Sequence, residues 1–271
     1  MLEIHKEIAE QVLVQFVRDS VWKNHFKNGI VGVSGGLDSA VTLALTQRAL
    51  GAEHTFALLM PYRLSSPQSL EHGRQLCELL GVAYEVVDIS ASVDAYFEKF
   101  PTDNKLLIGN KCARERMSVL YDFSERKKAL VVGTSNKSEM MIGYSTLFGD
   151  SAAAFLPIGD LYKTQVFQLA EQLDIPQAII DKKPSADLWE NQTDEGEIGL
   201  TYRELDEILF QMVDMRKKES EVMAMGYSRA NIQKIKRLMV RSQFKRTMPP
   251  VVKLQGRTVG IDFRYLRDWN K

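Results

Sequence analysis

Residues 30–39 read Ile-Val-Gly-Val-Ser-Gly-Gly-Leu-Asp-Ser and carry the strongest structural signal of the chain. Its apolar beginning is typical of a buried strand, and residues 40–50 after it have the pattern of a helix. Between the two, Gly35 and Gly36 allow a tight turn in which backbone N–H groups approach an anion closely. Because these N–H groups begin a helix, its dipole also favours negative charge there. The stretch therefore predicts a strand, a phosphate-binding turn and a helix.

Three side chains of this turn add to the prediction. Ser34 and Ser39 supply hydroxyl donors, whereas Asp38 places a carboxylate where phosphate oxygens would gather. A bound Mg²⁺ would turn that repulsion into attraction, so we interpret Asp38 as a metal ligand. The alternative is an ordinary strand-turn-helix with an acid that the helix dipole favours. The two serines together with the aspartate favour the phosphate site.

The predicted turn differs from the phosphate loop of kinase-like NTPases. The chain contains no Gly-Lys-Ser/Thr and no Gly-x-Gly-x-x-Gly, and no lysine lies between Ile30 and Arg48. Without that lysine, little stabilises charge on a transferring γ-phosphoryl group, so cleavage elsewhere in the triphosphate is favoured. The turn resembles that of the N-type ATP pyrophosphatases, which hold the β,γ-pyrophosphate and split ATP into AMP and pyrophosphate.

The composition indicates one α/β domain. A chain of 271 residues that is 45% hydrophobic can bury a full core. We predict a single domain over residues 1–271, with a nucleotide-binding core at about 25–185 and a C-terminal loop and helices at about 186–271. The 35 basic and 35 acidic residues give a net charge of +0, so we expect no nucleic-acid partner and no membrane surface.

The metal-binding residue types are sparse. Cys77 and Cys112 are the only cysteines and form no Cys-x-x-Cys pair, which argues against a disulfide framework or a thiolate zinc site. The four histidines show no ligand spacing, so any metal should be a hard, oxygen-bound ion. No stretch has the length of a membrane span or the features of a signal peptide. We expect a cytoplasmic protein.

Periodicity predicts the remaining elements. Strands are expected at 30–33, 55–60, 84–89 and 129–132. An opening helix is expected from residue 4 to an end near 27–29, and further helices at 40–50, 66–81, 90–100, 110–125, 162–173, 202–217 and 228–246. Strands separated by helices predict a Rossmann-like parallel sheet with helices on both faces, followed here by C-terminal helices. Ligands should bind beyond the carboxyl ends of the strands. The polar, acidic residues 189–197 are predicted to form a mobile loop.

A second candidate segment, Gly-Thr-Ser-Asn-Lys-Ser-Glu at residues 133–139, follows the last predicted strand. Thr134 could hydrogen-bond a nucleotide, and Glu139 could add a second carboxylate to the metal that Asp38 holds. The alternative is that Ser135 or Ser138 caps a helix and Glu139 lies in its first turn. The segment alone leaves both open.

The chain resembles the ammonia-dependent NAD⁺ synthetases, which are N-type ATP pyrophosphatases, over about residues 30 to 250. The matching stretches, in chain order, are 34–39, 109–117 with Leu120-Tyr121, 133–139, 148–150, 156–164, 183–188 and 245–246. Their joint order is far more specific than any one motif. The resemblance implies a fold of the adenine nucleotide α-hydrolase type and a homodimer.

The resemblance also assigns roles to residues. It implies that Asp38 and Glu139 bind Mg²⁺, and that Arg114 and Lys245 bind deamido-NAD⁺. The residues implied to bind ATP are Gly32, Val33, Ser34, Gly35, Gly36, Leu37, Asp38, Ser39, Thr134, Lys163 and Ser185. In the implied reaction, ATP adenylates the nicotinate carboxylate and releases pyrophosphate, and ammonia then displaces AMP.

Two residues are candidates for catalysis. Lys163 suits the first step, because a point charge stabilises negative charge that builds on the α-phosphate. Asp150 could position ammonia or take its proton. The alternatives are a solvated lysine in the first turn of a helix and an ordinary Gly-Asp turn. Arg114 and Arg116 lie two apart on one predicted helix and should point to different faces.

Three positions depart from the commoner family pattern. Leu147 replaces a lysine, Ala154 an aspartate and Phe244 a histidine, so contacts to the dinucleotide are less well defined than contacts to ATP.

Two other functions remain open at this point. One is another ATP pyrophosphatase, either tRNA-modifying or amide-forming, and the other is a non-catalytic ATP-binding switch. The predicted helix at 228–246 is basic, but it lacks interleaved aromatic residues for stacking on bases.

Overall fold

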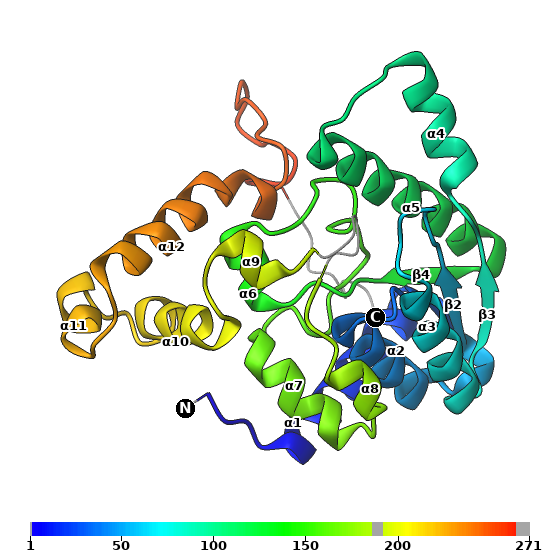
Figure 1. Ribbon diagram of the computed structural model, residues 1–271, viewed down its shortest axis with the longest axis horizontal. Coiled ribbons are helices and arrows are strands. Elements are labelled where there is room, and N and C mark those ends of the chain that lie inside the picture. The colour runs from blue at the N-terminus through cyan, green and yellow to red at the C-terminus, as the bar shows by residue number, and fades with distance from the viewer. Residues whose placement is uncertain (1, 186–191, 264–271) are drawn as a thin grey trace.

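The computed structural model describes residues 2–185 and 192–263. Within these residues, four strands form one parallel sheet in the order β3-β2-β1-β4 (Figure 1). The strands are β1 (Asn28–Gly32), β2 (Thr55–Leu59), β3 (Ala83–Val86) and β4 (Ala129–Val132). In β1, which pairs with a strand on each side, Ile30 lies opposite Phe56 of β2 and Val131 of β4. This arrangement confirms the predicted parallel α/β fold.

Neighbouring residues of a strand face opposite sides of the sheet, and here both sides are apolar. Helices therefore cover both faces. Val31 belongs to a core cluster with Leu43, on the face covered by α1 (Lys6–Trp22), α2 (Leu37–Leu50) and α3 (Pro67–Leu79). Ile30 belongs to a second cluster with Cys112, on the face covered by α4 (Ser90–Lys99) and α5 (Lys105–Lys127). A 3₁₀ turn, η1 (Ala52–His54), connects α2 to β2.

Helix α2 is the centre of the first layer. It packs on β1 and β2, and α1 and α7 (Lys163–Gln172) pack against its other sides. Its sequence is apolar nearly all the way round, as expected for a helix buried on every side. The short helix α8 (Gln177–Ile180) also contacts it. The N-terminus of α2 is thereby fixed at the carboxyl end of β1.

The remaining helices form a third apolar cluster beside the sheet, which includes Ile142, Tyr162 and Leu205. They are α6 (Lys137–Ile142), α9 (Asp194–Ile198), α10 (Tyr202–Val213), α11 (Glu219–Ala224) and α12 (Arg229–Arg241), with the 3₁₀ turn η2 (Gln243–Arg246) at the end. Figure 1 shows α10, α11 and α12 projecting to the left, away from the sheet. The division into one core and a C-terminal part of a single domain stays a prediction. None of the helices that the structure describes could span a lipid bilayer.

Several predicted boundaries are wrong. Helix α5 begins at Lys105 rather than 110, because the Asn104 side chain accepts hydrogen bonds from the N–H groups of Leu106 and Leu107. Strand β3 ends at Val86, and α12 ends at Arg241 rather than 246. The prediction of a loop is wrong at residues 194–197, which belong to α9, whereas 189–191 lie outside the described residues.

Candidate active site

The phosphate-binding turn has the predicted form. Gly36 is the N-cap of α2, so the helix begins at Leu37. The Ser34 hydroxyl accepts a hydrogen bond from the Gly36 N–H at 3.3 Å, and the Ser39 hydroxyl donates to the Gly36 carbonyl at 2.9 Å. Gly35 has φ +71°, in the left-handed region that favours glycine. The turn is therefore held by its own serines.

The turn opens into a cavity of about 550 Å³ at the carboxyl ends of β1 and β4. Most of the site residues expected from the sequence line this cavity: Gly32, Val33, Ser34, Gly36, Leu37, Asp38, Ser39, Thr134, Glu139, Asp150, Lys163, Ser185 and Lys245. Gly35 and Arg114 are not among the lining residues. The structure thus brings together segments that lie more than a hundred residues apart in the sequence.

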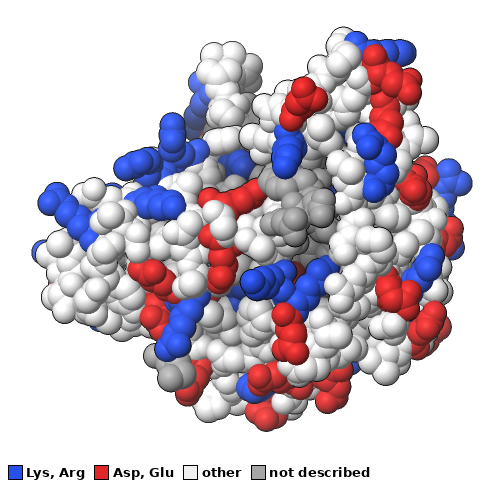
Figure 2. Space-filling view, viewed as in Figure 1, with Lys and Arg blue, Asp and Glu red and all other residues white. Residues whose placement is uncertain are grey.

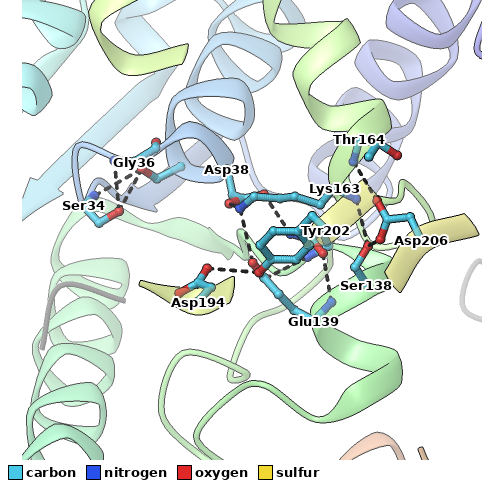
Figure 3. A network of polar contacts seen from close by, with 12 residues as sticks. Ser34, Gly36, Asp38, Ser138, Glu139, Lys163, Thr164, Asp194, Tyr202 and Asp206 are labelled. Carbon is cyan, nitrogen blue, oxygen red and sulfur yellow. Dashed lines mark hydrogen bonds and ion pairs between the residues drawn. The ribbon is translucent and has the colours of Figure 1, made fainter. Parts of the chain in front are cut away.

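Three charged side chains meet at the base of the cavity (Figure 3). The ammonium of Lys163, from the first turn of α7, forms an ion pair with Asp38 Oδ2. Its Nζ also lies 3.4 Å from Glu139 Oε1, in the first turn of α6. Lys163 is only 2% exposed, and the ring of Tyr202 lies 5.2 Å from its Nζ. The alternative of a solvated lysine is therefore wrong.

Burial and charge shift the pKa values in this cluster. Burial raises the pKa of Glu139, and the nearby Asp38 carboxylate raises it further, although Lys163 opposes the shift. Burial alone would lower the pKa of Lys163, but Asp38 and Glu139 outweigh it, so this pKa is raised. Lys163 accordingly stays protonated and supplies a permanent positive charge at the base of the cavity.

Glu139 has both of the properties that the sequence left open. Its backbone N–H donates to Asn136 Oδ1 at 3.0 Å, and its carboxylate accepts from the Asn136 N–H at 3.4 Å, which makes a capping box at the start of α6. The cap is Asn136, not Ser135 or Ser138. The same carboxylate lies beside Lys163 and lines the cavity. Capping therefore orients Glu139 without removing it from the site.

Sequence reasoning missed three acidic or aromatic partners. Asp194, at the start of α9, is 4% exposed, lines the cavity and accepts a hydrogen bond from the Tyr202 hydroxyl at 3.0 Å. Burial raises the pKa of Asp194. Asp206 of α10 accepts a hydrogen bond from the Thr164 N–H at 2.8 Å at the start of α7. The signal for α9 was present in the sequence, because Thr193 followed by two acids is a typical helix start.

The two arginines of α5 do point to different faces. Arg116 lines the cavity, and its Nε donates to the Met60 carbonyl at 2.9 Å. Arg114 is exposed and donates to the Leu147 carbonyl at 3.3 Å, outside the cavity lining. The role of Arg114 in substrate binding stays a prediction.

Asp150 and Lys245 are fixed to the loop that follows α6. Asp150 Oδ1 accepts a hydrogen bond from the Thr146 N–H at 2.7 Å. The residue is exposed where it lines the cavity, and desolvation by the surrounding protein raises its pKa. Lys245 Nζ donates to the carbonyls of Gly143 and Ser145 at 2.8 and 2.5 Å. The end of α12 at Arg241 matters here, because η2 places Lys245 at the cavity.

The surface charge is mixed. Figure 2 shows Lys and Arg gathered over α12 on the left and both signs interspersed over the rest of this face. On α12, Lys236 pairs with Glu219 at 2.5 Å. The prediction that no nucleic acid binds is compatible with this face and stays a prediction.

Comparison with known proteins identifies the family. A family model described as NAD synthase matches residues 9–249. The NH(3)-dependent NAD(+) synthetase of Trichlorobacter lovleyi is 50% identical over 270 residues, which cover 100% of this chain and 99% of that protein.

Two solved structures are also similar. The NMN synthetase of Francisella tularensis has 32% identity and a TM-score of 0.82, with 92% of this chain and 99% of that chain covered. The NH3-dependent NAD synthetase of Campylobacter jejuni, in complex with the nitrate ion, has 32% identity and a TM-score of 0.79, with 93% and 100% covered. The chain therefore belongs to the NAD synthase family.

Proposed function

We propose that the protein is a ligase that forms a carbon–nitrogen bond, amidating deamido-NAD⁺ with ammonia and converting ATP into AMP and pyrophosphate. The observation that carries the proposal is the buried Lys163–Asp38–Glu139 cluster beside a phosphate turn that has no lysine of its own. Membership of the NAD synthase family supports the same activity.

The ATP-binding residues have distinct roles in this proposal. The N–H groups at the start of α2 and the hydroxyls of Ser34 and Ser39 bind the β- and γ-phosphates, with Thr134 and Ser185 on the nucleoside side. Lys163 stabilises the charge that develops on the α-phosphate and on the departing pyrophosphate. Because its ammonium is already charged, Lys163 needs to gain no proton when the nucleotide arrives.

The residues present fit a magnesium ion. Asp38 and Glu139 direct carboxylate oxygens at the same cationic group, so the space between them already accommodates positive charge. Two protein carboxylates, completed by phosphate oxygens and water, are the usual ligands of Mg²⁺. Bound there, Mg²⁺ would neutralise charge on the triphosphate. Lys163 would then turn from the carboxylates toward the α-phosphate.

The second half-reaction would involve Asp150 and Lys245, which line the same cavity. The nicotinate carboxylate attacks the α-phosphorus, pyrophosphate leaves, and ammonia displaces AMP from the resulting acyl adenylate. The raised pKa of Asp150 makes its carboxylate a stronger base for the proton that the attacking nitrogen loses. Lys245, between the cavity and the carbonyl groups of 143 and 145, is available to the anionic dinucleotide.

The dinucleotide contacts, the homodimer and the cytoplasmic location are parts of the same proposal. Leu147, Ala154 and Phe244 lie outside the cavity lining, so these replacements leave the proposed ATP contacts intact. Arg114 is exposed and lies outside the cavity lining of its own chain, which suits a dinucleotide that extends beyond that cavity. Size-exclusion chromatography with light scattering tests the dimer.

The direct test is a product assay with purified protein, ATP, Mg²⁺, ammonium and deamido-NAD⁺. We expect AMP, pyrophosphate and NAD⁺ in equal amounts. A switch module would release no pyrophosphate in a substrate-dependent manner, and a tRNA-modifying enzyme would require RNA. Release of ADP and orthophosphate would contradict the proposal.

Asp38→Asn tests the proposed magnesium site, because it removes the negative charge of the side chain. The amide keeps the shape of the side chain, and Lys163 keeps Glu139 as its partner, so we expect the variant to fold with a loss of about 1 to 3 kcal/mol in the free energy of unfolding. Loss of the metal-binding charge should lower turnover by roughly 10²- to 10⁴-fold. Normal magnesium-dependent turnover with a folded variant would show that the ion lies elsewhere.

A second candidate substrate is the deamido mononucleotide. The similarity to a solved structure named NMN synthetase favours testing it, because the adenylation chemistry is the same for both substrates. We expect a higher kcat/KM for deamido-NAD⁺, in line with the more similar relative. The reverse preference would assign the mononucleotide.

A further inference from the structure

One buried amide joins the two halves of the site. Asn136 lies in the loop after β4, is 0% exposed, and is the N-cap of α6. Its Nδ2 donates to Asp38 Oδ1 at 2.9 Å, across 98 residues of sequence. Its Oδ1 accepts the Glu139 N–H at 3.0 Å, and its backbone N–H reaches the Glu139 carboxylate at 3.4 Å. One residue thus contacts both carboxylates that flank Lys163.

The chemistry of the partners fixes the orientation of this amide. The Asp38 carboxylate, paired with Lys163, can only accept hydrogen bonds, so the amide nitrogen must face it. The Glu139 N–H can only donate, so the amide oxygen must face α6. A rotation of the amide by half a turn would oppose like groups at both ends. Asparagine is the residue that satisfies both partners with one short side chain.

A cap alone does not need an asparagine. Serine and aspartate cap helices about as well, since each offers an oxygen to the N–H at the third helical position. Neither side chain has, in addition to this capping oxygen, an N–H group that could donate to the Asp38 carboxylate. The contact to Asp38 is therefore separable from capping, and substitution can remove one while keeping the other.

We propose that Asn136 is a positioning residue for the metal and the triphosphate: it holds the Asp38 and Glu139 carboxylates in a common orientation toward the cavity. The inference rests on the proposed function, because it assigns Asn136 to the same magnesium site. Hydrogen bonds to a charged carboxylate are strong and directional, and buried ones lock the rotamer of the ligand. When Mg²⁺ and phosphate draw Lys163 away from Asp38, the amide remains as the group that keeps Asp38 in place.

The test compares Asn136→Ser and Asn136→Asp with the wild type. Both variants keep a capping oxygen for Glu139, and both lose the donor to Asp38. We measure Mn²⁺ binding by the electron paramagnetic resonance of the free ion, in the presence of α,β-methylene-ATP, which cannot be cleaved at the α-phosphorus. The Kd for Mn²⁺ should rise by about 10- to 100-fold in Asn136→Ser. Turnover should recover toward the wild-type kcat at high Mg²⁺, because the defect is in binding.

Ser228→Ala is the control for capping. Ser228 accepts the Asn231 N–H at 3.1 Å at the start of α12 and does not line the cavity. This variant should lose stability without any change in the Kd for Mn²⁺. Comparing the Kd for Mn²⁺ in the two variants separates the orientation of Asp38 from the loss of stability.

The outcomes are distinguishable. A folded Asn136→Ser and a folded Asn136→Asp that both bind Mn²⁺ as the wild type does would overturn the inference. A shift in Kd that follows the loss of stability equally in Ser228→Ala would overturn it too. A wild type that binds no Mn²⁺ with the nucleotide would overturn both proposals, whereas one that binds Mn²⁺ but forms no amide would overturn the proposed function alone.

Discussion

At the scale of single residues, the site depends on a glycine that no other residue can replace. Gly35 has φ +71°, and a Cβ built there would lie 2.0 Å from the Ser69 carbonyl oxygen of α3. Lys182 binds the same residue of α3, since its Nζ donates a hydrogen bond to the Ser69 hydroxyl at 2.7 Å. Helix α3 therefore packs directly against the phosphate-binding turn.

Gly35→Ala should disable ATP binding. The methyl group cannot fit unless the turn or α3 moves, and the left-handed backbone adds about 1 to 2 kcal/mol for a residue other than glycine. We expect the affinity for a non-hydrolysable ATP analogue, measured by calorimetry, to fall at least about tenfold, which corresponds to about 1.4 kcal/mol.

Gly226→Ala isolates the backbone cost. Gly226 also has a positive φ, +98°, but nothing lies within 4 Å of a Cβ placed there. This variant should lose stability and keep nucleotide affinity. Equal affinities in the two alanine variants would refute the steric account.

The sequence predicted the charged residues of the site better than the residues that orient them. Asp38, Glu139 and Lys163 lie in motifs with recognisable spacing, and the structure brings all three together. Asn136 and Asp206 act through contacts to distant segments, which no local pattern encodes. Asn-x-x-Glu at 136–139 did carry the capping-box signal, although its link to Asp38 depends on the sheet.

At the scale of elements, α10 holds the start of α7 in place. Asp206 is fully buried and accepts hydrogen bonds from the Thr164 N–H and the Ser138 hydroxyl, and the same hydroxyl accepts the Lys163 N–H at 2.9 Å. The first N–H groups of α7 thus find their partners on α10 and α6. The position of Lys163 depends on this junction.

Asp206→Ala should therefore lower both stability and turnover. Two buried donors lose their acceptor, so we expect the free energy of unfolding, measured by urea denaturation, to fall by about 2 to 5 kcal/mol. Thr201→Ala removes an exposed cap of α10 and should cost about 1 kcal/mol with normal turnover. An Asp206→Ala protein as stable and active as Thr201→Ala would show that the junction is unimportant.

Elements with strong apolar periodicity were predicted well, and those without it were not. The first turn of α5 carries Leu106 and Leu107 on the surface, so burial gave no signal there and only the Asn104 cap marks the start. Helix α11 has six residues and was not predicted at all. Short helices are stabilised by packing against the rest of the molecule rather than by their own sequence.

At the scale of the whole molecule, the two cysteines lie in the apolar clusters on the two opposite faces of the sheet. Cys77, a residue of α3, belongs to the cluster that includes α2, and Cys112, a residue of α5, belongs to the cluster that includes α4. Burial raises the pKa of the Cys77 thiol to about 12 and also raises the pKa of Cys112. At pH 8, only about one Cys77 in ten thousand would be a thiolate. Neither thiol should react rapidly with Ellman's reagent until the protein unfolds.

The same shift predicts the direction of a pH effect. The pKa of the Cys77 thiol is about 9 in the unfolded protein and about 12 in the folded protein. Above pH 9, ionisation of this thiol therefore stabilises the unfolded state relative to the folded one. The free energy of unfolding should fall by about 1.4 kcal/mol per pH unit from this thiol between those values, and the group should contribute no slope below pH 9. Cys77→Ala should show a shallower decline, and an identical decline would contradict the burial of this thiol.

Adenylation of the substrate carboxylate can be followed through the fate of its two oxygen atoms. Deamido-NAD⁺ labelled with ¹⁸O at both nicotinate carboxylate oxygens is converted with ATP and ammonia, and the products are analysed by mass spectrometry. If Lys163, Asp38 and Glu139 direct adenylation of the substrate, each AMP carries one ¹⁸O, each new amide keeps one, and pyrophosphate carries none. Label in orthophosphate, or unlabelled AMP, would contradict the account.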